Sequence, residues 1–191
     1  MTTLKTLVAL EPRLDYDGTQ LRPHFIRGHF GLRGDAAVAF RGACHVEGEA
    51  LVDLADREAG LHIHSRDMVH LLVELFGRPL PHVVMLQRLL TCLVADRVRG
   101  ELSSDGARAV RRSGDDVFVG DGKLTVSIAT VSAVSGLIHL GVNIDDRDTP
   151  VATAALDPLG IGVDGFARGV LDDLLSELGG MDDALSKVQP R

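Results

Sequence analysis

The sequence predicts an α+β fold with a mainly antiparallel sheet and helices packed mostly on one face of it. Segments rich in β-branched residues, separated by Ser-Gly and Asp-Gly turns, follow one another from 107 to 144, which is typical of antiparallel strands. Other segments carry apolar residues at helical spacing. Strands and helices occur in this order without regular βαβ alternation, which favours an α+β architecture over a parallel sheet.

The N-terminal part is expected to form a short strand followed by a hairpin. Residues 4–10 have the composition of a strand. Residues 22–32 and 35–46 each mix apolar and polar residues at near-alternating spacing, and Arg33-Gly34 lies between them. This pattern predicts two paired strands.

Two helices are predicted in the middle of the chain. Ser65 is a suitable N-cap for a helix over 65–77, which Gly77 and Pro79 would close. Its apolar residues recur at i, i+3, i+4, i+7 and i+8: Met68, Leu71, Leu72, Leu75 and Phe76. A longer helix over 82–99 opens after Pro81 and stops at Gly100.

The second half of the chain is predicted to contain three or four antiparallel strands between 107 and 144 and then a helix over 163–178. Gly179-Gly180 is expected to break this last helix before a short final one. The expected sheet therefore combines residues 22–46 with 107–144.

Composition limits the classes of function. The chain has 191 residues, and its 20 Lys and Arg against 27 Asp and Glu give a net charge of −7. This acidic balance argues against duplex nucleic acid as a partner. Cys44 and Cys92 lack metal-site spacing and are expected to be reduced thiols. With no linker and no apolar segment long enough for a membrane span, we expect one domain over 1–191, located in the cytoplasm.

The segment from 115 to 144 carries the strongest chemical pattern. Asp115-Asp116, a short strand, a turn, Lys123-Leu-Thr and then Gly141-Val-Asn143 resemble the Asn-Asp, Lys-Leu-Ala-Gly and Gly-Ile-Asn motifs of biotin protein ligases. In that family the lysine contacts the acyl end of the substrate. The resemblance implies that Lys123 and Asp116 are catalytic and that Asp115 and Asn143 bind ligand, with ATP and Mg²⁺ as candidate cofactors. Lys123 would point into a pocket shared with Asp116, Arg112 and Asn143.

A second register is open. Arg111-Arg112-Ser-Gly resembles the opening of the Arg-Arg-x-Ser-Gly-Gly motif of lipoate ligases, which would place Arg111 and Arg112 at the ligand. Over its whole length the chain resembles the family called domain of unknown function 366, on segments such as Asp15-Tyr-Asp-Gly-Thr-Gln-Leu-Arg-Pro-His24 and 112–130. That family shares the fold of class II aminoacyl-tRNA synthetases and biotin ligases and has no assigned reaction. The resemblance also implies a homodimer.

Three further groups of residues have alternative interpretations. Arg22 and His24 would share one face of the predicted strand and form an anion-binding patch, or a solvated face. His139 lies in an apolar strand, as a ligand-binding residue or a core histidine. A metal site built from the residues His62, His64, His70 and Glu74 matches no specific pattern, so no metal ligand is predicted.

The sequence therefore predicts a protein that binds a small carboxylic acid or a nucleotide such as its adenylate. Whether it is an enzyme, a ligase or acyltransferase passing the acyl group to an amine, stays open. Val126 replaces the motif glycine, and a Gly- and Arg-rich covering loop is missing from the sequence. These departures favour the alternative, a non-catalytic small-molecule-binding module.

Overall fold

The computed structural model describes residues 4–145, 147 and 152–189, and its centre is a five-stranded sheet. The strand order is β1-β2-β3-β8-β7, with β1 and β2 parallel and all other neighbours antiparallel. Its strands are β1 (Lys5–Ala9), β2 (Ala36–Val46), β3 (Ile63–Phe76), β7 (Thr125–Val131) and β8 (Ser135–Asn143). A smaller antiparallel sheet contains β4 (Val110–Ser113), β5 (Asp116–Val119) and β6 (Gly122–Lys123). The predicted fold class is confirmed.

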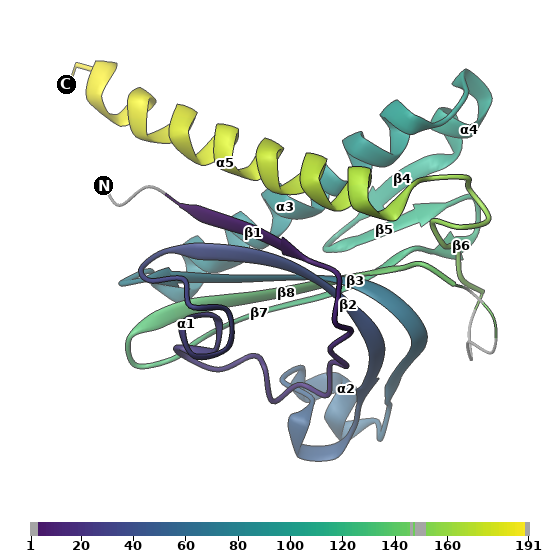
Figure 1. The fold of residues 1–191 in the computed structure, drawn as a ribbon, viewed down its shortest axis with the longest axis horizontal. Helices are drawn as coiled ribbons and strands as arrows, with labels where there is room; N and C mark the ends of the chain where they lie inside the picture. Colours follow the sequence, from purple (N-terminus) through teal and green to yellow (C-terminus); the bar gives the residue numbers. More distant parts are fainter. Residues whose placement is uncertain (1–3, 146, 148–151, 190–191) are drawn as a thin grey trace.

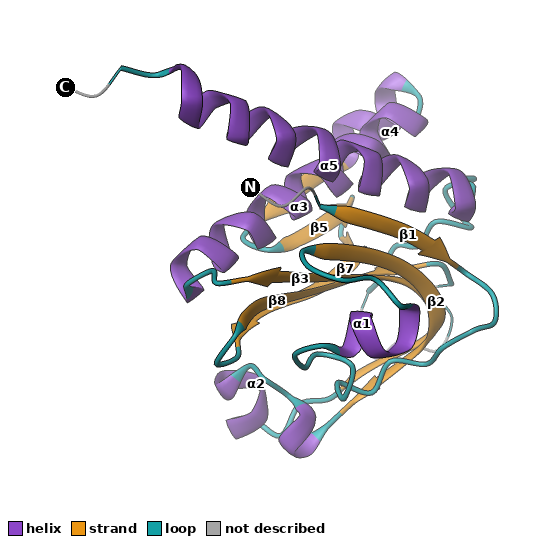
Figure 2. Cartoon of the chain, turned by 60° about the vertical axis from the view of Figure 1, so that its left-hand side comes forward, coloured by secondary structure: helices purple, strands orange, loops and turns teal. Residues whose placement is uncertain are grey.

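Helices lie on both faces of the large sheet (Figures 1 and 2). The long helices α3 (Leu80–Glu101) and α5 (Val163–Lys187) pack on one face, as predicted for the helices. The other face carries the short helices α1 (Phe25–Phe30) and α2 (Leu54–Glu58) and the 3-10 turn η1 (Gly48–Ala50). We call this second side the α1/α2 face. A further short helix, α4 (Ser104–Ala109), connects α3 to β4.

The predicted helix over 65–77 is wrong, because these residues form the central strand β3. Residues 67–75 are all buried, with the even-numbered Met68 and Leu72 on the α1/α2 face and the odd-numbered Val69 and Leu71 toward α3 and α5. A strand covered on both faces carries apolar residues on both, and between 67 and 75 only Asp67, His70 and Glu74 are polar. Such a run contains apolar residues at helical spacing by necessity, so periodicity cannot separate it from a buried helix.

The predicted hairpin of 22–32 with 35–46 is also wrong, because residues 25–30 form helix α1 and the antiparallel partner of β2 is β3. The turn before α1 places His24 in the left-handed region, at φ 64°. The apolar residues Phe25, Ile26 and Phe30 suggested a strand, but they lie on one short helix and pack against the sheet.

The two long helices follow the sequence closely, with one difference. The prediction of 82–99 is confirmed by α3, whereas α5 does not break at Gly179-Gly180 and continues to Lys187. Glycine costs a helix about 1 kcal/mol relative to alanine, and the strong helix formers on either side offset this. The second half of α5 projects past the sheet (Figures 1 and 2). Among the described residues, no helix is long and apolar enough to span a membrane.

The strands predicted between 107 and 144 are present, although residues 107–109 belong to α4. Only β7 and β8 join the large sheet. The small sheet packs beside the start of β7, where the N–H of Leu124 donates to the carbonyl of Val117 at 2.8 Å. This junction between the two sheets is where the ligase-like motif lies.

Candidate functional site

Lys123 and Asp116 form an ion pair at the junction of the two sheets. Nζ of Lys123, on β6, lies 2.9 Å from Oδ2 of Asp116, on β5. Their side chains are 34% and 24% exposed, so the pair is accessible from solvent. Burial raises the pKa of the Asp116 carboxyl, and the ammonium of Lys123 works in the opposite direction. The structure thus brings together the two residues that the motif singled out as catalytic.

Asn143 lies at the end of β8 and holds the backbone around Lys123 in place. Its side-chain amide donates to the carbonyl oxygens of Lys123 and Ala154, each at 3.3 Å. Its backbone N–H donates to the carbonyl of Leu124 at 3.0 Å. The asparagine therefore supports the position of Lys123, and both amide protons are directed at the protein's own backbone.

Asp115 points into a different set of contacts from its neighbour. Its carboxylate lies 3.2 Å from NH1 of Arg88 and accepts a hydrogen bond from the Gln87 amide at 3.0 Å. The same amide lies 2.7 Å from Oγ of Ser127. Gln87 and Arg88 come from α3, so Asp115 ties the small sheet to this helix. The sequence showed no signal that would have paired Asp115 with α3.

The two adjacent arginines of β4 make contacts that do not involve the ion pair. The guanidinium of Arg111 lies over the ring of Phe118, 4.0 Å from its centroid. Arg112 donates to the carbonyl of Gly114. Neither interaction involves Lys123, so the contacts do not bring Arg112 into the expected pocket.

Arg22 and His24 lie on the α1/α2 face, and not on a common strand as expected. Arg22 Nε donates to the carbonyl of Thr19 at 3.0 Å. The backbone N–H of His24 donates to Oε1 of Glu74 at 2.8 Å, and its ring stacks on Phe76. The strand geometry that suggested a shared anion site is absent, because residues 25–30 are helical.

His139 is buried on the α1/α2 face of β8 and forms a pair with His70 of β3. Nε2 of His139 lies 3.0 Å from Nδ1 of His70, and Nε2 of His70 lies 3.2 Å from the carbonyl oxygen of Gly42. Tyr16 stacks on the His139 ring at a centroid distance of 3.6 Å. Burial lowers the pKa of His70 to about 4 and that of His139 well below its ordinary value. Both imidazoles are therefore neutral at pH 7.

Tyr16 carries no signal of its own in the sequence, and His70 lies on a strand and not on the expected helix. The metal hypothesis used a helix to align His70 with Glu74, whereas both lie on strand β3. Within the described ranges, no group of three His, Cys, Asp or Glu side chains is arranged to hold a metal ion. The stacked rings of Tyr16, His70 and His139 come from three distant segments, so no local sequence pattern predicts their arrangement.

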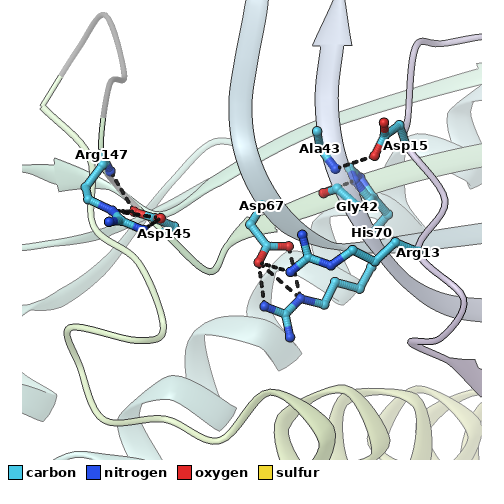
Figure 3. Close-up of polar contacts among 9 residues, drawn as sticks. Arg13, Asp15, Gly42, Ala43, Asp67, His70, Asp145 and Arg147 are labelled. Carbon is cyan, nitrogen blue, oxygen red and sulfur yellow. Dashed lines mark hydrogen bonds and ion pairs between the residues drawn. The ribbon is translucent and has the colours of Figure 1, made fainter.

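A second polar cluster surrounds Asp67 in the first half of β3 (Figure 3). The carboxylate accepts from Nε and NH2 of Arg41, at 3.0 and 2.5 Å, and from NH2 of Arg13 at 2.9 Å. Figure 3 also shows His70 beside Gly42, and Asp15 beside Ala43. Two guanidinium groups thus share one nearly buried carboxylate.

Comparison with solved structures defines the class of fold to which this site belongs. A bipartite lipoate protein ligase from Thermoplasma acidophilum matches with a TM-score of 0.59 at 13% identity, over 93% of this chain and 85% of that one. The biotin protein ligase of Leishmania major in complex with biotin matches with a TM-score of 0.55 at 12% identity, over 91% and 73%. The chain has the fold of the catalytic domains of biotin and lipoate protein ligases.

The chain belongs to the family described as Domain of unknown function (DUF366), whose model matches residues 5–189. The uncharacterised protein MJ0805 of Methanocaldococcus jannaschii is 30% identical over 99% of this chain and 86% of its own length. A protein of unknown function from Pyrococcus horikoshi is 34% identical, with a TM-score of 0.90 over 98% and 99% of the two chains.

Proposed function

We propose that this protein binds a small carboxylic acid, or the acyl-adenylate of such an acid, with Lys123 as its cationic contact. The observation that carries this proposal is the accessible ion pair of Lys123 with Asp116. An ammonium group has three N–H donors, and the contact with Asp116 uses one of them. Among the described residues no other group binds this ammonium, which leaves two donors for a second anionic oxygen.

Protonation of Asp116 would change the net charge beside Lys123. Because burial raises its pKa, Asp116 takes up a proton more readily than an exposed aspartate does. A carboxylate arriving beside Lys123 would raise that pKa further through like-charge repulsion. Proton uptake by Asp116 then leaves the ammonium to the ligand, so a bound acid and a protonated Asp116 support each other.

The fold gives independent support for the kind of ligand. The biotin protein ligase with the same fold was solved in complex with biotin, which is itself a small carboxylic acid. In this chain the matching residues Asp116 and Lys123 form an ion pair, although six residues of strand and turn separate them in sequence. Spacing and geometry agree at this one pair.

A second candidate function is binding without acyl transfer, and the packing above Gly141 favours it. A Cβ added to Gly141 would lie 2.8 Å from Cε of Met68 and 3.3 Å from Cγ2 of Val126. These side chains therefore cover the strand between Asn143 and His139. Val126 replaces the glycine of the ligase motif, and its side chain fills space beside the very strand that carries Asn143.

Titration calorimetry with octanoate, lipoate, biotin and ATP, each with Mg²⁺, tests the proposal. Lys123→Ala should weaken the binding of the acid by roughly tenfold to a hundredfold, since a charge-assisted hydrogen bond contributes about 1.5 to 3 kcal/mol. Lys187→Ala removes the same charge from an exposed helix end and should leave the affinity unchanged. Equal affinities in wild type and Lys123→Ala would reject the assignment. Pyrophosphate release with ATP and the bound acid separates a ligase from a binding module.

A further inference from the structure

A groove lies between the second half of α5 and the start of α3. It has a volume of about 460 Å³, and most of its wall is apolar. The wall comes from the two helices and from Leu4 and Leu75 at one end of the sheet. Well-packed proteins leave few voids larger than a water molecule, and no described part of the chain fills this one. The groove is therefore an apolar surface without a cover in the single chain.

The apolar stripe of α5 continues beyond the core of the protein. Its members are three and four residues apart in alternation: Leu171, Leu174, Leu178, Met181 and Leu185. The first two are buried, whereas Met181 is 41% and Leu185 is 68% exposed. An alternation of three and four residues keeps apolar side chains on the seam that one helix presents to another. Because this half of α5 projects past the sheet (Figure 2), its own sheet does not cover the seam.

The charges of the groove and of the helix are opposite. Arg78, on the α3 side of the groove, lies 3.9 Å from Oδ2 of Asp35, which is beyond hydrogen-bond distance. Its guanidinium has five N–H donors, and within the described ranges it makes no hydrogen bond. On α5, the carboxylates of Glu177, Asp182 and Asp183 have no ion-pair partner among the described residues. A second α5 helix in the groove would bring such carboxylates to Arg78.

A second copy of this chain offers both sides of this contact. Its α5 supplies an apolar seam with carboxylates beside it, and its own groove accepts the same seam in return. A two-fold interface needs such self-complementarity. The exposed side chains of Leu80, Met85 and Val188 extend the patch beyond the groove, toward the roughly 20 residues a side of a stable interface.

We propose that two copies of this chain associate about a two-fold axis, with the second half of each α5 lying antiparallel in the groove of the other copy. The seam of each helix then covers the groove, and its carboxylates face Arg78 of the partner subunit. This goes beyond the proposed function, because it requires neither an acid nor Lys123. It gives the homodimer expected from the sequence a defined surface.

Sedimentation equilibrium with three proteins tests the interface. Wild type should be dimeric at micromolar concentration. Leu185→Glu places a carboxylate in the apolar seam and should raise the Kd of the dimer about a hundredfold or more. Ser176→Glu adds the same group to α5 at an exposed position outside the groove, so its Kd should equal that of wild type. Circular dichroism confirms that each variant is folded.

A charge reversal tests the placement of the acidic helix. Arg78→Glu sets like charges against each other and should raise the Kd about tenfold or more. Arg57→Glu makes the same reversal at an exposed position of α2, away from the groove, and should have no effect.

Three results would overturn the proposal: a wild type that stays monomeric at all concentrations, a dimer that persists in Leu185→Glu, or an unchanged Kd in Arg78→Glu. Lys123→Ala should form the dimer as wild type does. Loss of acid binding and loss of the dimer are therefore separate outcomes, which distinguish a failure of the proposed function from a failure of this interface.

Discussion

The carbonyl oxygen of Leu14 occupies the space that a side chain at Gly42 would need, because a Cβ added to Gly42 would lie 2.1 Å from this oxygen. Backbone hydrogen bonds hold the segment there, from Leu14 N to the carbonyl of Arg41 at 2.9 Å and from Tyr16 N to that of Ala43 at 2.8 Å. The close approach positions Tyr16 over His139.

Gly42→Ala is therefore expected to destabilise the protein by about 3 kcal/mol, since backbone atoms must move to relieve the overlap. Urea unfolding measures the change. Gly100→Ala is the matched control, because Gly100 lies in α3 and an added Cβ there meets no other described part of the chain within 4 Å. Alanine there should be neutral or stabilise by up to about 1 kcal/mol. Equal effects at both glycines would contradict the packing described.

The neutral histidine pair predicts a loss of stability in mild acid. Unfolded histidine has a pKa near 6.5, and burial lowers the pKa of folded His70 to about 4. Between these values the unfolded state binds the proton and the native state does not, so the free energy of unfolding falls as pH decreases from 6.5 toward 4. For His70 alone the loss reaches about 3 kcal/mol at about 1.36 kcal/mol per pKa unit.

Urea unfolding at several pH values checks this expectation. His62→Gln, which removes an exposed histidine, should show the same fall as wild type. A free energy of unfolding that stays constant from pH 6.5 to 5 would mean that the pair is not buried in neutral form.

In the cluster at Asp67, loss of the carboxylate should reduce stability more than loss of Arg13. Asp67→Ala leaves Arg41, which is 26% exposed, without the carboxylate that binds it through two nitrogens. We expect a loss of about 3 kcal/mol in the free energy of unfolding. Arg13 is 51% exposed, so Arg13→Ala should cost at most about 1 kcal/mol. Comparable losses for both variants in urea unfolding would argue against this arrangement.

Asp116 should oppose the binding of an anion at Lys123. Asp116→Asn removes a like charge while keeping the side-chain shape, so it should tighten the binding of an anionic probe roughly threefold to tenfold. The probe 1-octanesulfonate stays ionised at all pH values used. With wild type its affinity should increase as pH falls and Asp116 takes up a proton, and with Asp116→Asn this dependence should vanish. Asp121→Asn, at an exposed turn position, controls for net charge.

The sequence predicted the parts of the fold that depend on local pattern. Helix α3 has one apolar face and clear ends, and the strands from β4 to β8 are separated by recognisable turns. Strand β3 was misread because its position between β2 and β8 buries both faces, which is a property of the whole sheet. The spacing of Asp116 and Lys123 found the ion pair, since a short turn links their strands.

The remaining site residues depend on contacts between distant segments. Tyr16, His70 and His139 come from a loop and two strands, and only the folded sheet stacks them. Arg112 was expected beside Lys123 on proximity in sequence, but its hydrogen bond to Gly114 keeps it within its own turn. Neighbours in sequence face different surroundings once strands pair, as Asp115 and Asp116 also show.

The connection over 47–62 can change in length or sequence without disturbing the strands that it joins. Its two ends are fixed by the pairing of Val46 with Ile63, while its interior, with η1 and α2, roofs a cavity next to His139. An insertion or deletion inside this connection alters the roof and leaves the register of β2 and β3 untouched. A change of this kind would reshape the wall of the cavity, while the pairing of the two strands beneath it stays the same.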